Sequence, residues 1–160
     1  MVDYAKICQK CGATCCKVGG TDFNEEEKKA VLNAGHEDYF VKIEEEHYEL
    51  RTENGVCPYL INENSCEIYE HRPKLCRRWP VYTYIRNNIR ETSLIMCPIS
   101  SYLQEEDINS MKELADNISL TFIADSIEKS KIQNLNTYAS IKCNAFNKIQ
   151  LGYKCKLDKT

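Results

Sequence analysis

Four cysteines occur within nine residues near the start of the chain, at Cys8, Cys11, Cys15 and Cys16. A tetrahedral metal with sulfur bonds of about 2.3 Å needs its sulfurs about 3.8 Å apart, and cysteines three positions apart on a tight turn can meet that spacing. Gly12 gives the backbone the freedom to curl back toward such ligands. Cys15 can complete a three-ligand loop, whereas Cys16 points elsewhere and can reach a second metal or another edge of a polynuclear cluster.

Four further cysteines lie in contexts typical of turns and element ends. Cys57 and Cys97 each precede a proline, Cys66 follows the turn-like segment NENS, and Cys76 lies in a short predicted helix. Buried structural thiols normally occur singly inside apolar runs, so this distribution favours metal ligation for all four.

Disulfide and redox alternatives fit less well. The amino-terminal MVDYAKICQK shows no apolar signal region, so we expect a cytoplasmic protein, in which disulfides are rare. Cys15 and Cys16 are also too close to bridge each other without strain. A thioredoxin-like dithiol needs its CxxC at the start of a helix in a βαβ unit, and no strand is predicted before Cys8.

The spacing leaves iron and zinc open. Zinc sites commonly use two separated CxxC pairs, whereas this chain has one pair, a close third cysteine and scattered single ones. A close triplet of cysteines with a remote Cys-Pro is typical of ferredoxins, although the spacing here is not that of ferredoxins. An iron–sulfur cluster, [4Fe–4S], is therefore slightly favoured over Zn²⁺. Basic residues around Cys76 can offset the negative charge of such a cluster, although solvation of a helix end explains them equally well: Arg72, Lys74, Arg77 and Arg78.

The remaining candidates are weaker. His71 precedes Cys76 closely and is a minor candidate ligand. We expect no chemical role for the other histidines, the last two cysteines or the acidic runs. His36 and His47 are predicted at the surface, Cys143 as a packed thiol and Cys155 on a mobile tail. The acidic runs Glu25–Glu27 and Glu44–Glu46 are predicted on solvated faces.

The elements that position these cysteines are short. The patterns predict a helix over 23–34, which begins with a capping box of Asp22 and Glu25 and ends at Gly35. A strand and turn over 46–56 follow, then extended pieces around NENS and a short helix between Pro73 and Pro80. The rest is predicted to form a hairpin around Asn87-Asn88 and helices over 104–123 and 136–150. The predicted class is α+β: a small irregular cysteine-rich metal-binding domain over 1–98 with short β-hairpins, and a helical C-terminal extension over 99–160 packed on it. The apolar stripe of the extension favours core packing over partner binding.

Composition supports a soluble globular chain. The 160 residues are 42% hydrophobic and 28% charged, with net charge −3, which gives no reason to expect nucleic acid or an anionic membrane. No apolar run is long enough to cross a membrane. We expect a protein partner that binds the helical C-terminal part.

Several motifs in order resemble the YkgJ-type cysteine-cluster family, which is described as zinc- or iron-chelating. They are CxxCxxxCC at 8–16, CPYL at 57–60, CEIYEHRPKLCRRWP at 66–80 and Cys97-Pro98, so the resemblance covers roughly 8–98. It implies eight ligands: Cys8, Cys11, Cys15, Cys16, Cys57, Cys66, Cys76 and Cys97. Tyr69, Arg72, Pro73, Arg77 and Pro80 match the family signature IY-x-x-RP-x-x-CR-x-x-P, whereas Trp79 stands where the family often has Phe. We expect Arg72 and Arg77 to support ligand sulfurs or carbonyls.

Three classes of function are compatible with such a cysteine cluster. In the first class, the metal is structural and the protein is an accessory module. In the second, an iron–sulfur cluster carries electrons or is delivered to a client protein. In the third, a metal with an open coordination position catalyses a reaction. The last class rests on a similar module in the longer flagellin lysine-N-methylases, but neither a Gly-rich nucleotide loop nor CxxxCxxC occurs here. A thiolate site can contribute about 10–16 kcal/mol, whereas whole domains are stable by about 5–15 kcal/mol. We therefore expect the metal-free chain to lose order across residues 1–98.

Overall fold

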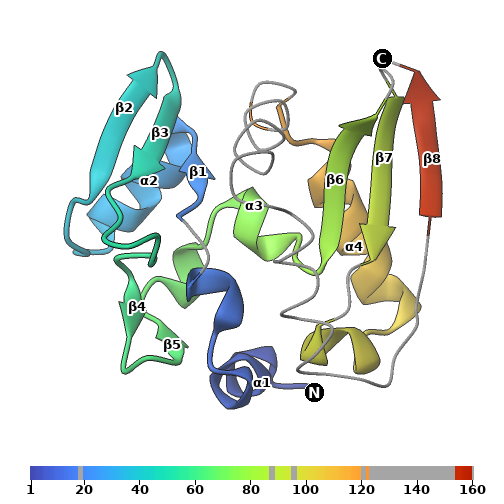
Figure 1. Cartoon of the computed structure of the whole chain (residues 1–160), viewed down its shortest axis with the longest axis horizontal. Helices are drawn as coiled ribbons and strands as arrows, with labels where there is room; N and C mark the ends of the chain where they lie inside the picture. Colours follow the sequence, from blue (N-terminus) through green and yellow to red (C-terminus); the bar gives the residue numbers. More distant parts are fainter. Residues whose placement is uncertain (18–19, 87–88, 95–96, 120–121, 123–153, 160) are drawn as a thin grey trace. The chain divides into compact units, whose positions relative to one another are not determined.

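The computed structural model describes residues 1–17, 20–86, 89–94, 97–119, 122 and 154–159. The chain forms two compact units, Met1–Cys76 and Arg77–Thr160, which are described separately. Each unit combines helices with a small antiparallel sheet, which confirms the predicted α+β class (Figure 1). The predicted division at residue 98 followed the cysteine motifs and stays a prediction.

The first unit opens with helix α1 (Tyr4–Cys11). The Asp3 side chain caps it by accepting a hydrogen bond from the Lys6 backbone N–H at 3.1 Å. Cys8 and Cys11 therefore lie on the last turns of a helix. The expectation that a tight turn holds this pair was wrong, because the capped segment between Asp3 and Cys11 contains no glycine or proline to break it.

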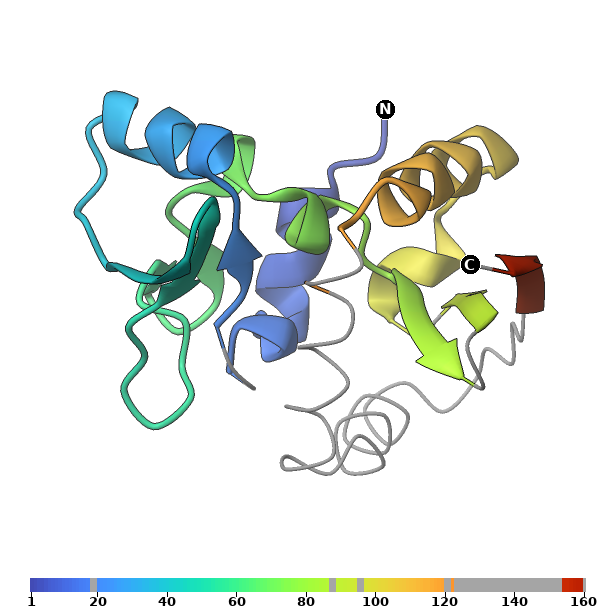
Figure 2. The same ribbon diagram turned by 90° about the horizontal axis from the view of Figure 1, so that it is seen from above.

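Three antiparallel strands form the larger sheet of the first unit, in the order β1-β3-β2. Helix α2 packs against β1 and β3, as the two views of the sheet show (Figures 1 and 2). The bounds are β1 (Asp22–Phe23), α2 (Glu25–Asn33), β2 (Phe40–Glu44) and β3 (His47–Leu50).

Helix α2 begins slightly later than the sequence indicated. Its capping box is Asn24 with Glu27, whose carboxylate accepts from the Asn24 N–H at 3.0 Å while Asn24 accepts from the Glu27 N–H at 2.8 Å. The predicted box of Asp22 and Glu25 was wrong, because Asp22 is taken up by strand β1. The predicted stop is confirmed, since Gly35 has a φ of +88° directly after the C-cap.

Both short turns after β3 are as predicted. Asn54 and Gly55 have φ values of 50° and 72°, which closes the turn after the strand. Asn62 and Glu63 also adopt positive φ and join β4 (Leu60–Ile61) to β5 (Ser65–Cys66), so NENS does form the bend.

One apolar core holds the first unit together. Its buried members are Phe23, Val31, Tyr48, Leu50, Tyr59 and Ile68. Phe23 and Phe40 meet edge to face with ring centroids 4.9 Å apart, and the Tyr59 hydroxyl donates to the Glu37 carbonyl at 2.7 Å. Cys57 and Cys66 pack against the same core. The core thus supports two candidate ligands directly.

The segment after β5 contains the 3₁₀ turn η2 (Tyr69–His71) and the one-turn helix α3 (Lys74–Arg77), which carries Cys76. The second unit has the predicted hairpin, β6 (Val81–Arg86) with β7 (Ile89–Leu94), followed by the 3₁₀ turn η3 (Pro98–Ser101).

Helix α4 (Glu105–Asp116) packs on β6. Its residue Ala115 belongs to one buried cluster with Val81 and Leu94. The predicted helix over 104–123 is therefore present but ends earlier, at the Asn117 C-cap.

A third strand, β8 (Lys154–Lys159), pairs with β7 and was not predicted. Cys155 lies on this strand opposite Thr92, so the expectation of a mobile tail there was wrong. The predicted helix over 136–150, Cys143 and Asn87-Asn88 lie outside the described residues. Among the helices that the structure describes, none has the length and apolarity needed to span a membrane.

Replacing Phe23 with Ala should lower the free energy of unfolding by about 3–5 kcal/mol, because Phe23 is fully buried in the core of the first unit. Urea titration of the metal-loaded protein measures the loss. Ile43→Ala is the control, since Ile43 is 49% exposed and its replacement should change stability by less than about 0.5 kcal/mol. Equal effects of the two changes would contradict this assignment of the core.

Candidate metal centre

The backbone reverses directly after α1. Gly12 and Ala13 both have positive φ, 77° and 49°, and the Ala13 N–H donates to the Cys8 carbonyl at 2.9 Å. The 3₁₀ turn η1 (Thr14–Lys17) follows at once and carries Cys15 and Cys16. The predicted role of Gly12 is confirmed, because this left-handed position redirects the chain so that two more cysteines follow a helix that already carries two.

A second cysteine segment is fastened to this turn by the backbone. The Cys57 N–H donates to the Cys16 carbonyl at 2.8 Å, which joins the loop before β4 to η1. Thr14 of the same turn contacts Cys11 at the end of α1. Its hydroxyl donates to the Cys11 carbonyl at 3.2 Å and lies 3.5 Å from the Cys11 sulfur.

Five thiols of the first unit share one electrostatic environment. Cys15 raises the pKa of each of four other cysteines, because a second thiolate nearby would repel the first. These four are Cys16, Cys57, Cys66 and Cys76. They come from η1, the loop before β4, strand β5 and helix α3, so folding brings together cysteines that lie far apart in the sequence.

Burial adds to these shifts. It is the main cause that raises the pKa of Cys57 to about 11 and that of Cys76 to about 12, and it raises the pKa of Cys66 in the same direction. For Cys16 the largest cause of the raised pKa is its hydrogen bond with Cys15. These four thiols are consequently neutral near pH 7 without metal, and a metal that binds them must displace their protons.

Helix α3, which carries Cys76, is anchored at its first residue. The second oxygen of the Glu27 carboxylate accepts a hydrogen bond from the Lys74 N–H at 2.8 Å. Glu27 thereby connects the start of α2 with the start of α3, so its predicted place on a merely solvated face was wrong. The Thr21 side chain hydrogen-bonds the Cys76 thiol and lowers its pKa, against the larger effect of burial. No sequence signal pointed to Thr21.

Of the two predicted supporting arginines, Arg72 lies beside the thiols. Its positive charge lowers the pKa of Cys66 and Cys76, although burial outweighs this effect. Its Nε donates to the Tyr69 carbonyl at 2.9 Å and its guanidinium lies 3.7 Å from the centre of the Tyr69 ring. The side chain is therefore held in place by a residue of the same family signature.

Arg77 and two predicted ligands have less defined roles. Arg77 is exposed and begins the second unit, where Arg78 is buried and donates to the Val81 carbonyl at 2.9 Å. Cys8 interacts electrostatically with Tyr69. Cys97 is buried at the start of η3 in the second unit. These assignments stay predictions.

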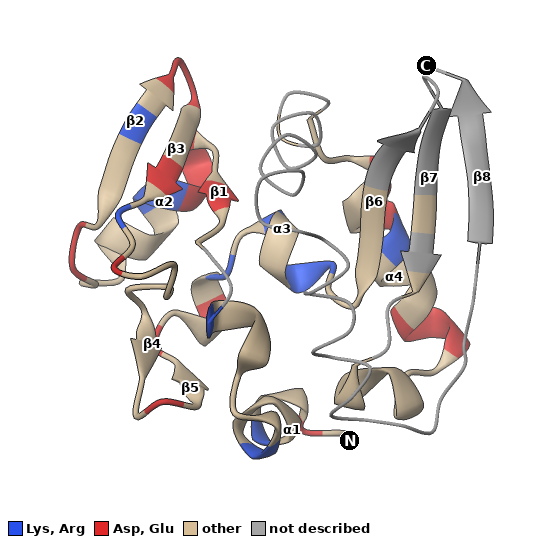
Figure 3. Cartoon of the chain, viewed as in Figure 1, with Lys and Arg blue, Asp and Glu red and all other residues tan. Residues whose placement is uncertain are grey.

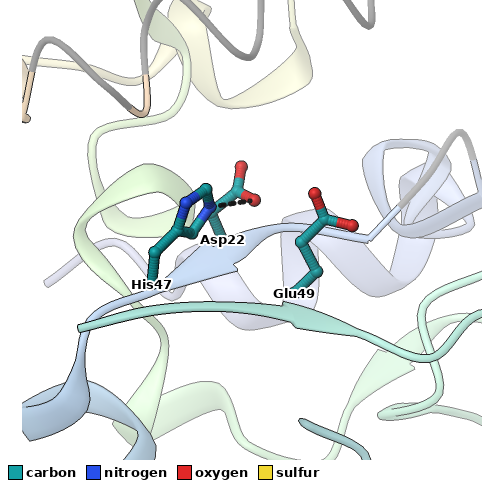
Figure 4. Close-up of side chains that lie close together, drawn as sticks. All are labelled: Asp22, His47 and Glu49. Carbon is teal, nitrogen blue, oxygen red and sulfur yellow. Dashed lines mark hydrogen bonds and ion pairs between the residues drawn. The ribbon is translucent and has the colours of Figure 1, made fainter. Parts of the chain in front are cut away.

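One group of possible metal ligands, made of a histidine and two carboxylates, was not predicted from the sequence. Among the described residues, one set of three possible ligands has all its ligand atoms within 4.8 Å of one another, and it contains no cysteine: Asp22, His47 and Glu49 (Figure 4). His47 is only 3% exposed, so its predicted surface position was wrong. It lies on the central strand of the sheet, which has β1 on one side and β2 on the other. His36 is half-buried and His71 is exposed.

Thiols from four segments of the first unit interact electrostatically, as is expected of a thiolate metal-binding domain. Comparison with protein families assigns residues 7–98 to CxxCxxCC, "Putative zinc- or iron-chelating domain", and the chain belongs to this family. Searches of curated proteins and of solved structures found no match. The chain has three residues between its second and third cysteines where the family name has two. Gly12 and Ala13 with positive φ fill part of this longer interval.

Replacing Arg72 with Ala should weaken metal retention by about 10–100-fold, because the guanidinium lies beside ligand thiols and compensates their negative charge. Competition with a chromophoric chelator measures retention. Arg51→Ala is the control, since Arg51 is an exposed residue of the same unit. Arg77→Ala tests the second predicted arginine in the same assay. If Arg72→Ala and Arg51→Ala retain metal equally, the supporting role of Arg72 is wrong.

Proposed function

We propose that the cysteine-rich part chelates iron as an iron–sulfur cluster and acts as an accessory, electron-transfer or cluster-carrying module. One observation carries this proposal: the thiol of Cys15 interacts with four other thiols within one compact unit. A closed tetrahedral zinc site uses four ligands. A [4Fe–4S] cluster also takes four thiolates, so five interacting thiols, with Cys8 and Cys11 on the preceding helix, suffice for either centre, and the charge next to them favours the cluster.

The surroundings of the thiols favour a charged cluster. A cluster held by four thiolates is an anion, and Arg72 supplies a positive charge next to Cys66 and Cys76. The cysteines of the first unit are half-buried rather than enclosed, so a centre built from them lies near the surface. Electron transfer and delivery to a client both require such access.

Structural zinc is the second candidate, and a different contact supports it. Cys57 and Cys66 pack directly against the apolar core of the first unit. A closed zinc site at this place would extend a small core and stabilise the fold. With either metal, we propose that the protein is cytoplasmic and that its helical C-terminal part binds a protein partner. Methyl transfer, the enzymatic alternative, has no support among the described contacts.

The test is metal and acid-labile sulfide content with a visible spectrum, on protein purified without oxygen. The proposal predicts iron with comparable sulfide and a band at roughly 400 nm. Cys76→Ser should lose most of that iron, because the Cys76 thiol lies among the other thiols. Cys155→Ser is the control and should keep it, since Cys155 belongs to a strand of the second unit.

Zinc without sulfide would overturn the cluster and leave the structural zinc module. Iron content that is the same in Cys76→Ser as in the wild-type protein would show that the gathered thiols are not the ligands.

A further inference from the structure

Strands β1 and β3 bring three possible metal ligands to one place. Asp22 on β1 is the direct cross-strand partner of Glu49 on β3. His47 precedes Glu49 by two positions, so the two side chains leave the same face of the strand. Figure 4 shows the imidazole and both carboxylates gathered beside the paired strands. Figure 3 shows further acidic residues in the turn between β2 and β3.

The arrangement concentrates negative charge in a partly dehydrated position. Asp22 is 6% exposed and Glu49 is half-buried, and their ligand atoms lie within 4.8 Å of each other. Carboxylates directly opposite each other in a sheet repel. A cation between them removes that repulsion, and either an imidazolium or a metal ion can supply it.

The contacts of His47 fit a metal ligand. One ring nitrogen, Nδ1, lies 3.5 Å from a carboxylate oxygen of Glu44, and the other, Nε2, lies 3.1 Å from Oδ1 of Asp22. With a metal on Nε2, the ring proton would lie on Nδ1, the side on which the Glu44 carboxylate is found. Two ligands of one ion with bonds of about 2.1 Å lie about 3.0 Å apart at a right angle. Nε2 and Oδ1, which are hydrogen-bonded at 3.1 Å in this structure, are thus close enough for both to reach one ion.

We infer that Asp22, His47 and Glu49 bind one divalent first-row metal ion, separate from the thiolate centre. One imidazole with two carboxylates is a hard, mixed nitrogen and oxygen set, which suits Mn²⁺, Fe²⁺ or Zn²⁺ and differs from the soft sulfur set of the cysteines. Strand β1 connects the two places, because Thr21, which hydrogen-bonds the Cys76 thiol, directly precedes Asp22. The inferred site is therefore one residue along the chain from a side chain that contacts the candidate thiolate centre.

Titration of the metal-loaded protein with Mn²⁺, followed by electron paramagnetic resonance, tests this inference. Mn²⁺ is the probe because thiolates bind it poorly and carboxylates bind it well. The wild-type chain should bind one Mn²⁺, and Glu49→Gln should weaken that binding by at least about tenfold while the content of thiolate-bound metal stays unchanged. Glu45→Gln is the charge-matched control, since Glu45 is exposed in the neighbouring turn, and it should bind as the wild type does.

A measurement on the wild-type chain covers the case in which the variant fails to fold. Substoichiometric Mn²⁺ should broaden the imidazole proton resonances of His47 before those of His36 and His71. The inference is overturned if the metal-loaded protein binds no Mn²⁺, if Glu49→Gln and Glu45→Gln bind it equally, or if the broadening begins at another histidine. Each of these results would leave the hydrogen bond between His47 and Asp22 as a purely structural contact of the sheet.

Discussion

The mutual repulsion of closely spaced thiolates is the constraint on which the first unit depends. Cys15 and the four thiols around it can lie together only when they are protonated or when a metal compensates their charge. Burial strengthens the constraint, since it raises the pKa of Cys57 and Cys76 to about 11 and 12. A bound metal converts this repulsion into a shared attraction, and for that reason the site and the fold cannot be separated energetically.

The elements around the thiols are short, and each depends on a few polar contacts. Helix α3 has a single turn, and the Glu27 carboxylate fixes its first residue. The loop before β4 meets η1 through one backbone hydrogen bond between Cys57 and Cys16. The apolar core packs against Cys57 and Cys66. A metal bound by these thiols would fix their arrangement, and Arg72 lies beside two of them with a positive charge.

Sequence patterns predicted what depends on local chemistry. The turns at Asn54-Gly55 and at NENS, the hairpin of the second unit and the left-handed Gly12 all follow from residue type alone. The sequence patterns failed where pairing between strands that are distant in the sequence determines the structure. Asp22 looked like a helix cap but pairs with β3, and β8 forms only because β7 offers it an edge. His47 looked like a surface residue, although an H-x-E alternation on a central strand could have indicated two side chains on one face. Thr21 carried no signal of any kind.

The central claim is that metal held by these thiols orders the first unit, and the most direct test is the methyl NMR spectrum of the full chain before and after complete removal of metal. We predict that the dispersed signals of Val31 and Leu50, both in the core of the first unit, collapse on removal and return when the metal is restored. Dispersed, unchanged signals from these two residues in fully demetallated protein would contradict the claim.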